Sequence, residues 1–238
     1  MNKGNDTNKG FDPNKKSHFI MIPIEDQSFV EAYNQLVNNI KSENLQNISP
    51  YLFQKDGKLH MTVCTLNIGE ESSKLDKYLN FLSGIEEEVK KISSGGVNFN
   101  FDGYSTLGEG ANTRVLYVKM KKDDQYEKLG KIIDFLISRL VKSNLLNQEE
   151  IEQNFIVFDN LTNKYSITVH LTILNVLFWN KILKKNKQKP LKGLNSTQLL
   201  DYLINMLLPN ANINCFNFCR MREDKNTEKY EIIKTYYL

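Results

Sequence analysis

Apolar residues recur along the chain at two spacings: every second residue, which predicts strands, and every third or fourth residue, which predicts helices. A short apolar run at residues 19–24 predicts a first strand, and apolar positions at helical spacing from Phe29 to Ile40 predict a helix after it. Residues 59–67 then alternate between apolar and polar side chains, which predicts a second strand. The chain therefore opens with strand, helix and strand.

The rest of the chain repeats these two patterns. Helical spacing predicts helices at about 73–92, 126–140 and 196–209, and Asp76, three residues after Ser73, resembles a capping arrangement. Alternation predicts the remaining strands: a hairpin of 97–102 and 114–120 around a glycine-bearing loop at 103–113, the clearest strand at 165–173, and a closing pair at 213–221 and 229–237. Residues 144–164 are interpreted as a polar connection with one apolar patch.

This order of elements is a mixed α+β pattern in which roughly the same unit is used twice. We expect a bilobal α+β fold, with two pseudo-symmetric lobes around a central cleft, each with an antiparallel sheet and flanking helices. Residues 1–17 are polar and rich in Asn, Lys and Gly, which predicts a disordered tail. Residues 18–238 are then expected to form a single bilobal domain.

Composition narrows the setting of this domain. The 238 residues are 40% hydrophobic and 25% charged, without a run of about 18 apolar residues, so we expect no membrane insertion. Cys64, Cys215 and Cys219 cannot all pair, which favours a reducing, intracellular setting in the cytoplasm or nucleus. The net charge of +3 is too small to predict nonspecific nucleic-acid binding, and the lysine-rich run at 184–192 is interpreted as a solvated loop.

Two His-x-Thr motifs carry the candidate chemistry, His60-Met61-Thr62 and His170-Leu171-Thr172. On a strand, residues i and i+2 project from one face, so each motif presents an imidazole beside a hydroxyl while the middle residue points into the core. Two of three histidines acquire a Thr at this spacing by chance with a probability on the order of 1%. The alternative for either histidine is an ordinary structural role. The third, His18, is expected to be exposed at the tail boundary.

A pair of histidines on either side of a phosphorus atom can share the work of phosphodiester cleavage. One imidazole removes a proton from the attacking oxygen and the other protonates the leaving oxygen, because both titrate near neutral pH. The two Thr hydroxyls would hold non-bridging oxygens. This scheme needs no cofactor and no metal, and no His-Glu-x-x-His or paired Cys-x-x-Cys motif is present. Cys64, on the face of His60, is interpreted as a buried filler.

The segments KLHMTVCTL and TVHLTILN resemble the paired signatures of the two-histidine phosphoesterase superfamily, which includes the LigT-type RNA phosphoesterases. The likeness is greatest to the central domain of the A-kinase anchoring protein branch and covers about residues 17–237. It also takes in SHFIMIPI, FDGYSTLG, RVLYVKM and INCFNFCRM, in that order. The sequence departs from relatives in having Val169 where a Pro often precedes the second histidine, and in a longer connection before that strand.

The resemblance implies a cleft with His60 and Thr62 from one lobe, His170 and Thr172 from the other, and a nucleotide or RNA-end phosphate between them. The activities it implies include opening of 2′,3′-cyclic phosphates, cleavage of 2′,5′-linked oligoadenylates and 3′-end trimming of RNA. We expect a phosphodiesterase of the first two classes, and a monomer. The alternative is a nucleotide-binding sensor or scaffold domain with little turnover, and a purely structural domain is a third reading. The kinase-anchoring helix of the namesake proteins lies outside the domain, so kinase anchoring is not expected.

A second group of candidates lies before the strand at 114–120. The loop at residues 103–113 is expected to form one wall of a nucleotide pocket. This expectation rests on the resemblance and on glycines that let the backbone approach a ligand. The candidate nucleotide-binding residues are Thr106, Gly108 and Arg114. The alternative is a surface hairpin loop with a salt-bridged Arg114.

Overall fold

Two antiparallel sheets form the centre of the protein in a computed structural model that describes residues 16–43, 48–224 and 226–238. The larger sheet has the strand order β11-β10-β1-β2, with β1 (His18–Pro23), β2 (His60–Leu66), β10 (Cys215–Glu223) and β11 (Tyr230–Tyr237). The smaller sheet has the order β4-β5-β8, with β4 (Phe101–Leu107), β5 (Val115–Met120) and β8 (His170–Asn175). Two short pairs complete the strands: β3 (Val97–Phe99) with β9 (Ala211–Ile213), and β6 (Val157–Asp159) with β7 (Lys164–Ser166).

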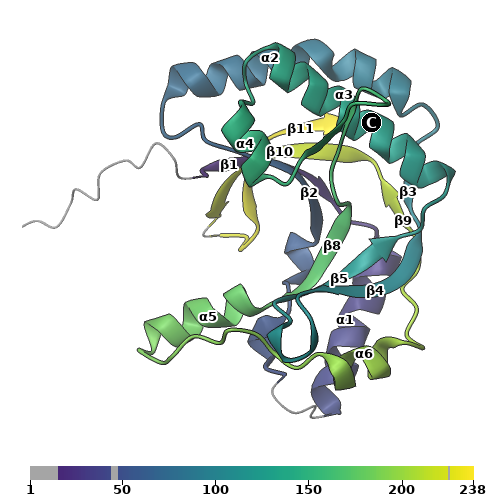
Figure 1. Cartoon of the computed structure of the whole chain (residues 1–238), viewed down its shortest axis with the longest axis vertical. Coiled ribbons are helices and arrows are strands. Elements are labelled where there is room, and N and C mark those ends of the chain that lie inside the picture. The colour runs from purple at the N-terminus through teal and green to yellow at the C-terminus, as the bar shows by residue number, and fades with distance from the viewer. Residues whose placement is uncertain (1–15, 44–47, 225) are drawn as a thin grey trace, which may run out of the picture.

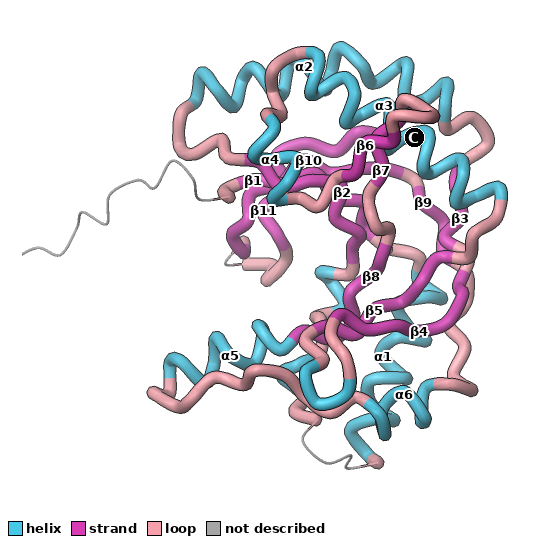
Figure 2. The backbone as a smooth tube through the Cα atoms, in the orientation of Figure 1, coloured by secondary structure: helices cyan, strands magenta, loops and turns pink. Residues whose placement is uncertain are grey.

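Helices lie outside the two sheets (Figure 1 and Figure 2). The α-helices are α1 (Gln27–Ser42), α2 (Ser72–Ile92), α3 (Asp124–Lys142), α4 (Gln148–Gln153), α5 (Val176–Lys185) and α6 (Thr197–Leu203). Short 3-10 helices are η1 (Pro50–Leu52), η2 (Asp56–Lys58) and η3 (Gly110–Asn112). Figure 1 shows α2 and α3 along the larger sheet, α1 and α6 beside the smaller one, and α5 extending outward. The predicted α+β class is confirmed. None of the helices in the described ranges has the length and apolar character needed to cross a membrane.

The chain does not fill the two sheets one after the other. It enters the larger sheet with β1 and β2, and returns to it at the end with β10 and β11, so that β1 pairs with both β2 and β10. The helix that follows β1 is tied to the smaller sheet, because the Tyr33 hydroxyl of α1 donates to the carbonyl oxygens of Gln54 (2.6 Å) and Ile173 in β8 (3.3 Å). These crossings hold the two sheets together.

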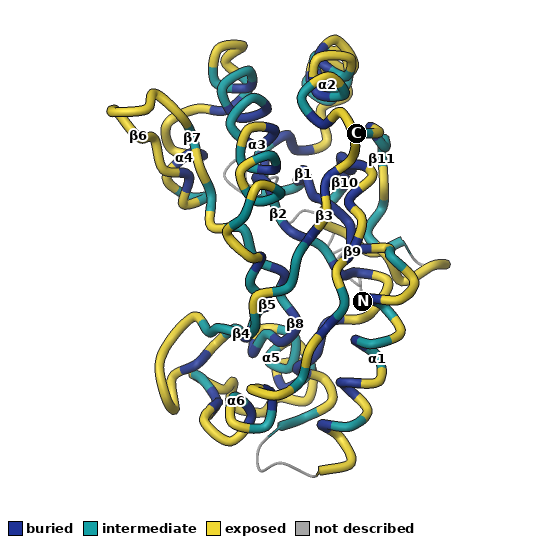
Figure 3. The backbone as a smooth tube through the Cα atoms, turned by 90° about the vertical axis from the view of Figure 1, so that its right-hand side faces the viewer, coloured by how far each residue is buried: buried dark blue, intermediate teal, exposed yellow. Residues whose placement is uncertain are grey.

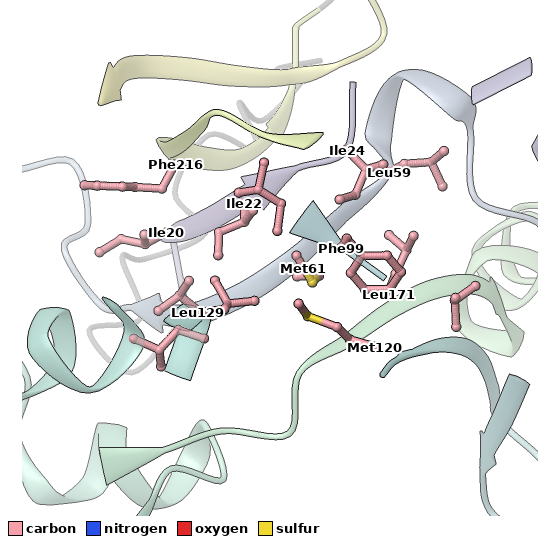
Figure 4. Packing of buried hydrophobic residues seen from close by; sticks show 14 of the residues in the cluster. Ile20, Ile22, Ile24, Leu59, Met61, Phe99, Met120, Leu129, Leu171 and Phe216 are labelled. Atoms are coloured by element: carbon pink, nitrogen blue, oxygen red, sulfur yellow. The ribbon is translucent and has the colours of Figure 1, made fainter. Parts of the chain in front are cut away.

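One hydrophobic cluster spans both sheets. Met61 from β2 and Leu171 from β8, the middle residues of the two His-x-Thr motifs, belong to it with exposed fractions of 2% and 0%. Figure 4 shows them in the same packed region as Met120 and Phe99, and Figure 3 shows buried strands between largely exposed outer helix faces. Each such side chain stabilises the fold by roughly 1.5–3 kcal/mol relative to exposure. The motif strands are therefore anchored through their middle residues.

The predicted strand at 165–173 is wrong, because it is two strands with different partners. β7 pairs with β6 and packs on α3, whereas β8 begins only at His170 and pairs with β5. The sequence does not reveal the break between β7 and β8, because the alternation of apolar and polar residues continues through residues 167–169. Ile167 and Val169 in this connecting segment are half-buried. Each motif histidine is therefore the first residue of its strand, His60 in β2 and His170 in β8.

Several local predictions also need correction. Helix α5 and helix α4 were not predicted, and α6 ends at Leu203, earlier than expected. Helix α2 has Glu71 at its N-cap without a side-chain capping bond, so the capping arrangement of Ser73 and Asp76 is absent there. Strand β4 runs on through residues 103–107, which were expected to be loop.

The start of the domain differs from the prediction at two positions. The expected disorder of residues 1–15 falls outside the described residues. Ser17 is part of the fold, because its backbone N–H donates to the Leu66 carbonyl (3.1 Å) and its hydroxyl accepts from the Gly69 N–H (2.8 Å). His18 is only 2% exposed rather than solvent-exposed, since it is the first residue of β1 and stacks on Phe218.

Candidate functional site

Strands β2 and β8 bring the two His-x-Thr motifs together from the two sheets, since these strands contact each other. In both motifs the His and Thr side chains are half-buried and the residue between them is buried. The burial pattern is the same over the first five residues of each strand. Each strand therefore presents an imidazole and a hydroxyl on its open face, as the spacing predicts.

Both motif strands carry a β-bulge directly after the Thr. Met21 and Ile20 of β1 pair with Thr62 and Cys64, which leaves Val63 as an extra residue in β2. The smaller sheet repeats this, because Ile173 is the extra residue between Thr172 and Leu174 in β8. Bulges occur frequently beside active sites, where they end or redirect a regular ladder. The two motifs share this irregularity as well as their residues.

The bulge in β2 corrects one prediction about Cys64. The extra residue turns its side chain to the core side, with Ile20, instead of the face of His60 and Thr62. Cys64 is 1% exposed, and burial raises the pKa of its thiol to about 12. A thiol in that state is protonated at neutral pH, so the prediction of a buried filler is confirmed.

Each motif histidine is held by the same backbone hydrogen bond. His60 Nδ1 lies 2.7 Å from the carbonyl oxygen of Lys58, and His170 Nδ1 lies 2.8 Å from that of Thr168. A carbonyl can only accept, so Nδ1 must carry the hydrogen in both rings. Nε2 is then the free nitrogen of each imidazole, an acceptor when the ring is neutral and a donor when it is protonated.

Aromatic rings pack edge-on against both imidazoles. Phe19 and Tyr230 lie 5.6 and 5.3 Å from His60 between ring centroids, and Tyr117 lies 5.3 Å from His170. The pKa of His60 is lowered, first by burial and also by the proximity of His170, against an opposing effect of its bond to the Lys58 carbonyl. His60 therefore favours the neutral, proton-accepting form at neutral pH.

The Thr62 and Thr172 hydroxyls are available to a ligand. Within the part of the chain that the structure describes, neither hydroxyl forms a hydrogen bond. Thr65, farther along β2, contrasts with them, because its hydroxyl is bonded to Asn154 Oδ1 at 2.7 Å. Two free hydroxyls beside two free Nε2 atoms can contact one tetrahedral anion such as phosphate.

Of the residues predicted to line the nucleotide pocket, Thr106 does not share the sheet face of the second motif. Thr106 of β4 pairs with the buried Leu116 of β5, so it lies on the sheet face opposite His170 and Thr172. Its neighbour Ser105 pairs with Tyr117, which in turn pairs with Thr172, and so shares the face of the motif. The register, which sequence alone did not supply, thus distinguishes Ser105 from Thr106.

Gly108 and Arg114 lie in the connection between β4 and β5. Gly108 has a φ of +91°, and a Cβ there would collide with the carbonyl oxygen of Asn112, so the turn itself requires glycine. Arg114 is exposed, and its backbone bonds to Leu107 and Val176 anchor it to β4 and the start of α5. No salt bridge to its guanidinium is found among the described residues, which removes the expected salt bridge of the alternative reading.

The sequence did not predict the residues that contact the motif histidines, Tyr230, Tyr117 and Lys58. Tyr230 and Tyr117 are distant in sequence from the histidines that they contact, and neither belongs to a His-x-Thr motif. Lys58 is only 6% exposed, accepts from His60 through its carbonyl and pairs through Nζ with Glu223 at 2.6 Å. Among the described residues, no group of three or more His, Cys, Asp or Glu side chains is placed to hold a metal ion.

The chain is similar to one protein family and to several solved structures. A family model described as "AKAP7 2'5' RNA ligase-like domain" matches residues 16–238. Escherichia coli LigT in apo form is 14% identical with a TM-score of 0.50, covering 94% of this chain and 97% of LigT. Kluyveromyces marxianus Usb1 is 12% identical with a TM-score of 0.48, covering 94% and 99%. Curated protein sequences give no significant match.

Proposed function

The chain belongs to the AKAP7 2′5′ RNA ligase-like family of the two-histidine phosphoesterase superfamily, and we propose that it is a metal-independent phosphodiesterase acting on 2′,5′-oligoadenylate or 2′,3′-cyclic phosphates. The observation that carries the proposal is the matched presentation of two imidazoles. His60 and His170 both direct a free Nε2 from an open strand face, beside a free Thr hydroxyl. One phosphate contacted by both motifs receives an acid, a base and two hydrogen-bond donors.

In the proposed reaction one Nε2 takes the proton of the attacking hydroxyl or water while its oxygen bonds to phosphorus. The bond from phosphorus to the leaving oxygen breaks, and that oxygen takes a proton from the other, protonated imidazole. The Nδ1 bonds to backbone carbonyls keep each ring in the tautomer this requires. No proton is gained or lost overall, and the histidines exchange protonation states.

We assign the base to His60 and the acid to His170 in the forward direction. Burial between Phe19 and Tyr230 lowers the pKa of His60, which keeps its Nε2 unprotonated at neutral pH. A positive charge on His170 lowers the pKa of His60 further, which favours a neutral His60 in the state in which His170 acts as the acid. That state is the reactive one.

Thr62 and Thr172 are proposed to hold the non-bridging oxygens, and residues of β4 and β5 to form a wall for the nucleotide. Ser105 is the hydroxyl on the motif face of that wall, Gly108 shapes its turn, and Arg114 is a charged group at its edge. Thr106 remains part of the wall through its backbone. Unchanged nucleotide affinity in Arg114→Ala would remove that residue from the site.

The proposal is tested by an activity panel of 2′,5′-oligoadenylate, 2′,3′-cyclic nucleotides and 3′-tailed RNA, run with and without EDTA. Cleavage that persists in EDTA supports it. Cleavage abolished by EDTA and restored by magnesium, manganese or zinc would move the chemistry to a metal-activated water. Binding of AMP without cleavage of any panel member would favour the nucleotide-binding sensor instead.

A further inference from the structure

A pocket of about 410 Å³ lies beside His60, between segments far apart in the chain. Its walls come from η1 and the residues after it, from α5, and from the hairpin end where β10 leads to β11. Figure 1 shows α5 and that hairpin end on the same side of the molecule. We call it the lysine pocket, after Lys55, Lys58, Lys181 and Lys185, which line it. Its volume falls in the range of about 300–1,000 Å³ typical of ligand sites.

The lysine pocket adjoins the candidate site through two residues. Tyr230 lines the pocket and packs edge-on against His60 at 5.3 Å. Lys58 also lines it, and its carbonyl oxygen is the acceptor for His60 Nδ1. A ligand in the pocket therefore lies one side chain away from the proposed reaction, within reach of the same bound molecule.

The charges of the pocket do not balance. Lys58 is paired with Glu223 at 2.6 Å and Lys55 with Glu228 at 2.5 Å. Lys181 and Lys185, one turn apart on α5, are exposed and form no salt bridge within the described residues. The bond from Lys58 holds the pKa of Glu223 below its usual range, so this ion pair persists near neutral pH. Two positive charges remain, and an anion is the ligand that would neutralise them.

An aromatic surface stands at the rim of the same pocket. Tyr51 lines it, is 55% exposed and stacks on Trp179 with ring centroids 5.0 Å apart and an interplanar angle of 6°. The stack covers one face of the Tyr51 ring and fixes its orientation. Stacking of a nucleobase on such a ring is a sequence-tolerant contact in single-stranded nucleic-acid binding.

We propose that the lysine pocket is a second nucleotide subsite, which holds the nucleotide next to the scissile bond with its phosphate on Lys181 and Lys185 and its base on Tyr51. This inference rests on the proposed function, because the bound strand continues from the phosphate between the two histidines. The consequence is that an oligonucleotide binds more tightly than a mononucleotide, by contacts that AMP cannot make.

The test is calorimetric binding to the full chain carrying His170→Ala, so that the ligand is not cleaved. The ligands are 5′-phosphorylated 2′,5′-linked triadenylate, AMP and inorganic pyrophosphate. The pocket variant is Lys181→Ala/Lys185→Ala, and the matched control is Lys184→Ala/Lys189→Ala, which removes the same charge from exposed lysines outside the lining. Tyr51→Leu removes the stacking ring, and Tyr51→Phe retains it.

The reference, or parent, is the chain that carries only His170→Ala. We expect the pocket variant to bind triadenylate at least about tenfold more weakly than the parent, and AMP with an affinity within about twofold of the parent. The control variant should bind both ligands as the parent does. For triadenylate, the slope of the logarithm of the binding constant against the logarithm of the salt concentration should become shallower by about 0.7, because the pocket variant no longer neutralises one phosphate. Tyr51→Leu should weaken triadenylate about fivefold or more, whereas Tyr51→Phe should not. This pattern would hold even if the unsubstituted protein cleaves no panel member, and in that case only the proposed function would fail.

Three results would overturn the subsite. The first is triadenylate affinity that the pocket variant leaves unchanged, or that the control lowers equally. The second is a parent protein that binds triadenylate no more tightly than AMP. The third is pyrophosphate binding with the same affinity and the same loss in the pocket variant, which would make the pocket a simple anion site. Histidine-dependent turnover together with any of these would leave the proposed function standing alone.

Discussion

His170 lies close enough to His60 for a positive charge on its ring to lower the pKa of His60. That charge favours a pair with a neutral His60 and a protonated His170, intermediate in charge between the doubly protonated and the neutral pair. That intermediate state is what paired acid–base catalysis needs. The relationship follows from the contact of β2 with β8, which brings the two motifs together although about 110 residues separate them.

Replacing either motif histidine should abolish most of the activity. His60→Ala and His170→Ala are each expected to lower kcat at least about a hundredfold on any substrate that the native protein cleaves, the usual scale for a general acid or base. His18→Gln, tested at pH 7.5, is the control, because it changes the one histidine outside the motifs. Native turnover by either motif variant would contradict the assignment.

The Thr hydroxyls should matter for rate and not for folding. Thr62→Val and Thr172→Val keep the shape of the side chain and remove a donor, so each should lower kcat/KM by about a hundredfold with an unchanged Tm. Thr65→Val reverses this pattern. It breaks the bond to Asn154 and should lower stability by about 1 kcal/mol while leaving kcat/KM near native. A Tm loss in the motif variants without a rate loss would make their hydroxyls structural.

Ser105 and Thr106 provide a test of the sheet register. Ser105 shares the face of Thr172 through Tyr117, whereas Thr106 lies opposite with Leu116. Ser105→Ala should weaken AMP binding by about 2- to 12-fold, the value of one hydrogen bond, and Thr106→Val should not. The measurement is a titration of both variants under the same salt conditions. The opposite order of effects would restore Thr106 to the site.

His18 should make stability depend on pH. Its pKa is lowered to about 4, first by burial and then by Arg220, against weaker opposing effects of Glu70 and Glu231. As the pH falls below about 6.5, the unfolded chain binds a proton that the folded protein refuses, so stability is present above this range and lost toward pH 4. The loss is on the order of 3 kcal/mol.

Urea unfolding at several pH values checks this prediction, with His18→Gln as the comparison. The free energy of unfolding should fall more steeply for the native chain between pH 6.5 and 4 than for the variant. Parallel curves for the two proteins would show that His18 does not cause the effect.

Local patterns in the sequence were sufficient for the first motif strand and three long helices. Alternation placed His60 beside Thr62, and helical spacing gave α1, α2 and α3 within a few residues. The α+β class followed from their order. Each of these features is encoded within a short window, where side-chain periodicity reports which face is buried.

Features that depend on pairing between residues far apart in the sequence could not be predicted from local patterns. The break before His170 exists because β7 and β8 pair with different strands, and the bulge at Val63 is visible only in its pairing with β1. Helix α5 was missed because only one polar residue, its N-cap Asn175, separates its apolar residues 176–179 from those of β8. The sequence pattern therefore placed Lys185 in a solvated loop, whereas the structure places it on α5 with Lys181.

The decisive measurement for the pairing of His60 and His170 as acid and base is the pH dependence of kcat/KM after exhaustive chelation. The native chain should give a bell-shaped profile, whose acidic limb comes from protonation of His60 and lies below the usual histidine range because the pKa of His60 is lowered. A profile with a single limb, or activity that requires an added metal ion, would contradict it.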